Sequence, residues 1–118
     1  CLEYQSSNFD VYSGDDLMLL EALKNQANGI ISVCSNGYPK TFKKIVKLFL
    51  DGFTDEAEVL FNNYKKYFEL MFEEPNPIPI KYLMHKINYS TKFYRLPLYY
   101  PSEELKRKLD ENFIGDEA

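Results

Sequence analysis

The most constraining feature of this chain is an alternation of strand and helix patterns in its first half that gives way to helix patterns alone. Residues 9–12 form a short aromatic and β-branched run that predicts a strand, and residues 13–16 predict a tight turn. A helix should follow at once, because the next apolar positions are Leu19, Leu20 and Leu23. After Gly29, the uniformly apolar residues 30–34 predict a second strand, of the kind that is covered on both faces of a parallel sheet.

The rest of the chain has helical periodicity. Pro39 is suited to the first turn of a helix whose apolar face carries Phe42, Ile45, Val46 and Phe49 and which ends at Asp51-Gly52. We expect Thr54 to cap the next helix, whose buried face is marked by Ala57, Leu60, Phe61, Tyr64, Tyr67, Phe68 and Met71. Two further helices are predicted, one entered through Pro77 and Pro79 and one capped by Ser102.

Strands that alternate with helices are parallel and are joined by right-handed crossovers, so the sequence predicts an α/β fold. Two parallel strands cannot form a closed sheet, and each would leave an unpaired edge. We therefore expect the neighbouring strands to lie upstream of Cys1 or in another chain. The first residue is not Met, and residues 1–5 lack the pattern of a signal peptide, which also indicates the middle of a longer chain.

Charge and hydropathy exclude several classes of function. The formal net charge is −4 with acidic and basic residues interspersed, so no basic stripe is available for nucleic acid. No apolar run approaches the roughly 20 residues that span a bilayer. Cys1 and Cys34 lack metal-ligand spacing, so we expect free thiols rather than a disulfide, and a cytoplasmic location. We expect neither a metal nor a cofactor.

Four motifs point to a known family: Ser13-Gly14-Asp15-Asp16, Gly29-Ile30-Ile31-Ser32-Val33, Asn76-Pro77-Ile78-Pro79-Ile80-Lys81 and Arg95-Leu96-Pro97-Leu98. In this order and spacing they resemble the C-terminal part of the dihydrodipicolinate synthases. The related N-acetylneuraminate lyases share the barrel and the lysine chemistry, but the paired aspartates and the Asn-Pro-Ile-Pro-Ile-Lys run look more like the synthases. A fragment of another pyruvate-dependent aldolase is the alternative within this superfamily.

The resemblance implies the last part of a (β/α)8 TIM barrel. Residues 1–52 would supply strands seven and eight with their helices, and residues 53–118 a C-terminal helical extension. In this family, a lyase of lysine biosynthesis, pyruvate forms a Schiff base with a lysine of strand six and then attacks aspartate semialdehyde. That lysine would lie upstream in the missing N-terminal barrel segment, so we expect no catalytic residue here and no activity from this chain alone. The whole enzyme is expected to be a homodimer or homotetramer.

The resemblance also implies three substrate-binding residues. Gly14 would let a substrate approach the backbone, Ile31 would pack beside the Schiff base, and Asn76 would offer its amide to the second substrate. Gly14 follows the first predicted strand, and Ile31 lies in the second. Active sites of such barrels lie at the C-terminal ends of the strands, which places Ser13-Gly14-Asp15 and the loop from Cys34 to Tyr38 on the catalytic rim.

Other residues have plainer interpretations. Asp15 and Asp16 are expected to cap a helix rather than to bind a metal. His85 lacks a ligand or carboxylate at a suitable spacing and is expected to be a surface or packing residue, and Lys81 stands too early in a helix for a desolvated Schiff-base amine.

Two further features leave alternatives open. The aromatic stripe from Phe61 to Phe72 is expected to be core rather than a ligand groove. Asn36-Gly37, after the second strand, is either a plain turn or a functional loop. A different class of function, a helical interaction module without catalysis, would use exposed aromatic faces to dock a partner.

Overall fold

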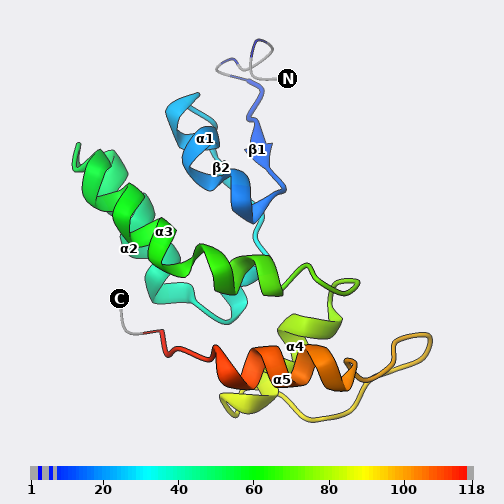
Figure 1. Ribbon diagram of the computed structural model, residues 1–118. Coiled ribbons are helices and arrows are strands. Elements are labelled where there is room, and N and C mark those ends of the chain that lie inside the picture. The colour runs from blue at the N-terminus through cyan, green and yellow to red at the C-terminus, as the bar shows by residue number, and fades with distance from the viewer. Residues whose placement is uncertain (1–2, 4–5, 7, 117–118) are drawn as a thin grey trace.

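The computed structural model describes Glu3, Ser6 and residues 8–116. Two short strands and their helix lie at one end of the molecule, the helices α2 and α3 lie in the middle, and α4 and α5 form the other end (Figure 1). The elements in chain order are β1 (Tyr12–Ser13), the 3-10 turn η2 (Asp16–Met18), α1 (Leu19–Lys24), β2 (Gly29–Ile30), the 3-10 turn η3 (Cys34–Asn36), α2 (Pro39–Leu50), α3 (Thr54–Leu70), α4 (Ile78–Lys86) and α5 (Glu103–Glu111).

The two strands are parallel neighbours, as the sequence pattern predicts. Tyr12 pairs with Gly29 and Ser13 with Ile30. The ladder continues beyond both ends of the pair, because the Asn28 N–H donates to the Val11 carbonyl and the Ile31 N–H to the Ser13 carbonyl, both at 2.8 Å. Within the described residues this sheet has two strands, so it leaves edges unpaired.

Both predicted strands were placed incorrectly at their ends. The first begins at Tyr12 rather than at Phe9, which forms an isolated antiparallel bridge with Ser6. The second ends at Ile30 rather than at Cys34, where a 3-10 turn has already begun. A uniformly apolar run indicates burial but does not say where side-chain hydrogen bonds will turn the chain.

The helix starts follow the local sequence in most cases. Pro39 is the first residue of α2, and the Ser102 hydroxyl accepts a hydrogen bond from the Leu105 N–H at 3.1 Å, as predicted. The prediction for Thr54 was wrong: Phe53 stands at the cap position, without a side-chain hydrogen bond, and Thr54 is the first helical residue. Gly52 takes a φ of +90°, a value that favours glycine and lets the chain turn between α2 and α3.

One distant residue completes the start of α2. The carboxylate of Asp116 accepts hydrogen bonds from the N–H groups of Lys40 and Thr41 and from the Thr41 hydroxyl, each at 2.8 Å. The first N–H groups of a helix have no partner within the helix, and a negative charge there is favourable. The C-terminal segment is thereby fastened to α2.

The core is centred on the aromatic face of α3, which packs against α2, η2 and α5. Phe68 is fully buried, and four rings lie around it with centroids 4.8 to 6.1 Å away: Tyr38, Phe42, Phe61 and Tyr64. The stripe of α3 is therefore core, as predicted, although Phe72 beyond its end is exposed.

The molecule is extended rather than spherical. Its radius of gyration is 15.5 Å, above the about 13.5 Å of a compact domain of this length. Several large apolar side chains around the strand pair are exposed, including Phe9, Tyr12 and Ile31. Among the described residues, no helix is both long enough and apolar enough to cross a membrane. Cys34 is a free buried thiol, and the predicted absence of a bond to Cys1 concerns a residue outside the described part.

Candidate functional site

Gly14 and Ile31 lie side by side where the two parallel strands end. Each follows the last residue of its strand, and the hydrogen bond from the Ile31 N–H to the Ser13 carbonyl holds the two backbones together. Ile31 is 69% exposed, and a Cβ built on Gly14 would meet no atom within 4 Å. The strand ends therefore present an open backbone position beside an uncovered apolar side chain.

Asp16 organises the segments behind this edge. It is fully buried, and its carboxylate accepts hydrogen bonds from the Ser32 hydroxyl and from the N–H groups of Val33 at 2.9 Å and Cys34 at 3.3 Å. The segment after β1 is thus fixed to the segment after β2. A buried carboxylate with several donors is stable because the donors replace its lost hydration.

The capping prediction was right for one aspartate and wrong for the other. Asp15 stands before η2 and accepts a hydrogen bond from the Leu17 N–H at 2.9 Å. Asp16 instead points inward to Ser32, a residue of the second motif for which no role was predicted. One sequence feature could have indicated this role. Two acidic residues stand in succession before the apolar face of the helix, and the start of the helix needs only one of them as a cap.

Cys34 and Tyr38 are buried behind the same segments. Burial, reinforced by the charge of Asp16, raises the pKa of the Cys34 thiol, and its Sγ lies 3.8 Å from the Phe68 carbonyl oxygen. Burial also raises the pKa of Tyr38. Both groups therefore stay protonated at neutral pH, and Cys34 is a packing residue rather than a nucleophile.

Asn76 comes from a different part of the chain. It is exposed in the connection between α3 and α4 and precedes Pro77 through a cis peptide bond. Gly14 and Ile31 follow the two strands, whereas Asn76 follows α3, which packs against η2. Gly14 and Ile31, two of the three predicted substrate-binding residues, thus lie side by side.

The residues with plainer interpretations are held by ordinary contacts. The His85 Nδ1 lies 3.0 Å from the Ser90 carbonyl oxygen, and the Lys81 Nζ lies 5.4 Å from the centre of the Tyr94 ring. Asn36 donates to the Val33 carbonyl at 2.9 Å. Gly37 is buried, and a Cβ there would lie 2.5 Å from a methyl carbon of Leu83.

Comparisons with known proteins agree on one family. The model of the "Dihydrodipicolinate synthetase family" matches residues 1–113. The 4-hydroxy-tetrahydrodipicolinate synthase of Chlorobium limicola is 36% identical over 110 residues, which are 93% of this chain and 37% of that protein. This chain therefore spans little more than a third of that relative's length.

Solved structures give the same result. The dihydrodipicolinate synthase of Aquifex aeolicus superposes with a TM-score of 0.87 at 33% identity, over 93% of this chain and 38% of that one. The 4-hydroxy-tetrahydrodipicolinate synthase of Methylacidiphilum fumariolicum superposes with a TM-score of 0.86 at 31% identity, over 93% of this chain and 37% of that one.

Proposed function

Because the chain belongs to the dihydrodipicolinate synthetase family, we propose that it forms the C-terminal part of a 4-hydroxy-tetrahydrodipicolinate synthase. In this proposal β1 and β2 are strands seven and eight of a (β/α)8 barrel. Residues 1–52 carry the last two strand and helix units, and residues 53–118 are the helical extension. The enzyme is cytoplasmic and assembles as a homodimer or homotetramer.

The observation that carries the proposal is the parallel pair with an exposed apolar residue at its C-terminal end. A two-stranded parallel sheet is not stable in isolation, and parallel strands are normally covered on both faces. The exposure of Ile31 and of Tyr12, at 69% and 51%, is unfavourable in water and would be removed by neighbouring barrel strands. The strand ends would then face the centre of the barrel mouth, where such folds carry their chemistry.

The proposed reaction uses a lysine supplied by the rest of the barrel. Its neutral amine attacks the carbonyl carbon of pyruvate, water leaves, and an imine forms. Loss of a methyl proton gives an enamine, whose carbon attacks the aldehyde carbon of aspartate semialdehyde. By this account the present chain does not supply the nucleophile, which agrees with the packing role of Cys34.

This chain would contribute residues that line one side of the substrate site. Gly14 leaves room for the substrate to reach the backbone, since nothing lies within 4 Å of its missing Cβ. Ile31 would exclude water beside the imine and thereby favour the neutral amine. Asn76 would donate from its amide to a carboxylate of the second substrate, after the loop that carries it is covered by the barrel.

A chimera tests this proposal without depending on the association of two fragments. The matching C-terminal third of the Chlorobium limicola enzyme is replaced by this chain, and the product is treated with pyruvate and borohydride. We expect a covalent pyruvate adduct by mass spectrometry, and condensation activity with aspartate semialdehyde. A folded chimera that forms no adduct would show that the proposal is wrong.

Variants of the chimera separate the site from the fold. Gly14→Ala should leave thermal stability unchanged, because the added methyl has space in this chain, and should lower kcat/KM at least about tenfold, or about 1.4 kcal/mol in the transition state. Lys65→Gln on the exposed face of α3 serves as the matched control and should change neither value. Full activity of a folded Gly14→Ala chimera would show that Gly14 has no role in substrate binding.

A further inference from the structure

A separate pocket lies at the opposite end of the molecule, between α4, α5 and the segment that joins them. Its volume is about 300 Å³, and it is lined by Tyr82, His85, Lys92, Tyr94, Tyr100 and Lys106. We call it the tyrosine pocket. It shares no lining residue with the strand ends, and its size falls at the lower end of the range for small-molecule sites.

The aromatic walls of the tyrosine pocket are held in place. The Tyr94 and Tyr100 rings meet edge to face, with centroids 5.0 Å apart and planes at 61°. The Tyr94 hydroxyl donates to the Ile78 carbonyl at 3.3 Å, and the Tyr82 hydroxyl donates to the Asp110 carboxylate at 3.1 Å. Two ring positions are therefore preorganised, which lowers the entropy cost of binding a flat ligand.

The charged groups in the lining are all basic. Lys92 is exposed and forms no ion pair with the described residues. The Lys106 Nζ lies 2.6 Å from a Glu103 carboxylate oxygen, which satisfies part of its hydrogen-bonding capacity. His85 Nδ1 is engaged by the Ser90 carbonyl, which holds the ring in place in the pocket wall.

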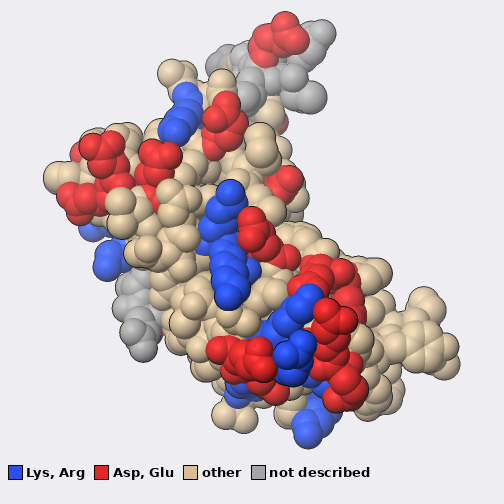
Figure 2. Space-filling view, viewed as in Figure 1, with Lys and Arg blue, Asp and Glu red and all other residues tan. Residues whose placement is uncertain are grey.

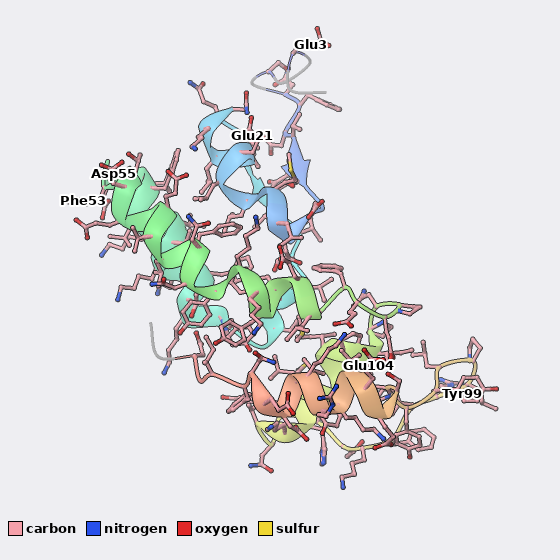
Figure 3. The ribbon with its side chains drawn as sticks, in the orientation of Figure 1. Glu3, Glu21, Phe53, Asp55, Tyr99 and Glu104 are labelled. Atoms are coloured by element: carbon pink, nitrogen blue, oxygen red, sulfur yellow. The ribbon has the colours of Figure 1, made fainter. Side chains whose placement is uncertain are left out.

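The nearby acidic groups have partners of their own. Asp110 is paired with Lys86 at 2.7 Å as well as with Tyr82, and Glu74 accepts from the Ser102 N–H at 3.1 Å. Figure 2 shows acidic and basic side chains interleaved over the α5 end of the molecule, whereas the projecting tip of the α4–α5 segment shows no charged side chain on this face. Tyr99 points outward at that tip and away from the pocket's helices (Figure 3).

The balance of charge decides the kind of ligand. Three tyrosines by themselves would suit a cation, as in aromatic cages. The two lysines in the same lining repel a cation, and Lys81 already occupies one face of Tyr94. A ligand that satisfies both features is flat, apolar on its faces and negative at its edge.

We propose that the tyrosine pocket binds a small aromatic carboxylate, with its ring against Tyr94 and Tyr100 and its carboxylate between Lys92 and Lys106. Such a site is distinct from the proposed active site and does not require the rest of a barrel. Its failure would leave the proposed function untouched, and failure of the chimera would leave the pocket untouched.

Benzoate is the probe, and the full chain is the protein. The chain has ten tyrosines and no tryptophan, so tyrosine fluorescence and ligand-observed NMR both report on binding. We expect benzoate to bind at least about tenfold more tightly than benzylamine, which has the same ring and the opposite charge, and than acetate, which has the charge without the ring. Equal affinity for benzoate and benzylamine, or no binding of benzoate at millimolar concentration, would overturn the proposal.

Two variants assign the site. Lys92→Gln and Tyr100→Ala change exposed side chains, so both should fold, as far-ultraviolet circular dichroism will verify. Each should weaken benzoate binding at least about fivefold, and the affinity of the Lys92 variant should also depend less on salt, because one of the two lysines is lost. Lys65→Gln is the matched control and should leave the affinity unchanged. Unaltered affinity in both pocket variants would place benzoate elsewhere and refute the assignment.

Discussion

The hydroxyl of Ser32 donates a hydrogen bond to the carboxylate of Asp16, and through this contact the turn that follows one strand is tied to the turn that follows the other. The two residues are separated by 16 positions and by helix α1. The same carboxylate takes the N–H groups of Val33 and Cys34, so one buried negative charge shapes the start of η3.

We expect Asp16→Asn to lower the free energy of unfolding by about 2–3 kcal/mol, because an amide presents one oxygen where the carboxylate presents two, and its N–H₂ would face other donors. Urea denaturation measures the change. The matched control is Asp15→Asn, which keeps a good capping side chain and should cost less than about 0.5 kcal/mol. Equal losses in the two variants would show that Asp16 acts as a simple cap.

Gly37→Ala should destabilise the chain by about 1–3 kcal/mol, because the new methyl would overlap Leu83, which is itself buried. Thermal unfolding measures the change. Gly14→Ala is the control, because a methyl group on Gly14 has open space and should leave the melting temperature unchanged. A neutral Gly37→Ala would mean that the helix α4 shifts easily, and the packing of η3 on α4 would then be weak.

Cys34 should resist thiol reagents in the native state. Its pKa is raised by burial and by Asp16, so the reactive thiolate is scarce as well as inaccessible. In a Cys1→Ser background, labelling with 5,5′-dithiobis(2-nitrobenzoate) should be at least about a hundredfold slower than in urea. Rapid native labelling would contradict the burial of this residue.

The lowered pKa of Asp110 predicts how the stability of the folded chain changes with pH. Its hydrogen bond with Lys86, helped by Tyr82, lowers its pKa below the ordinary value of 3.8. A carboxylate whose folded pKa is depressed stabilises the protein above its unfolded pKa, and this contribution is lost as the pH falls through the folded pKa. The melting temperature of Asp110→Asn should therefore lie below that of the parent near pH 6 and converge with it as the pH falls through the depressed pKa of the folded state.

The size of this effect is bounded by exposure, since the Asp110 side chain is 50% exposed. We expect less than about 1 kcal/mol at neutral pH, reduced further by salt. A gap between the two melting curves that widens on acidification would give the opposite sign and would contradict the depressed pKa.

The local signals in the sequence anticipated much of the fold. Pro39, Ser102 and the apolar stripe of α3 act within a turn or two of helix, where neighbours along the chain determine the outcome. The parallel pairing of β1 and β2 was also predicted correctly, because two neighbouring strands that are joined through a helix run in the same direction.

Two features were missed because their contacts span long sequence separations. The second strand is short because Asp16 reaches forward to the segment after Ile30, and α2 is capped by Asp116, which lies 75 positions beyond Thr41. A pattern within a window of ten residues contains neither partner. Sequence motifs could nominate Gly14, Ile31 and Asn76 together, and the hydrogen bond between the strand ends places the first two side by side.

Phe68 touches rings that come from both sides of the α2–α3 turn, and this has a consequence for how the molecule melts. An element that shared no buried side chain with its neighbour could fray by itself, but the two middle helices lose the same contacts at the same moment. We expect α2 and α3 to unfold in one cooperative thermal transition. The strand pair and the C-terminal segment should unfold with them, because the first is held to α3 through η2 and the second to α2 through Asp116.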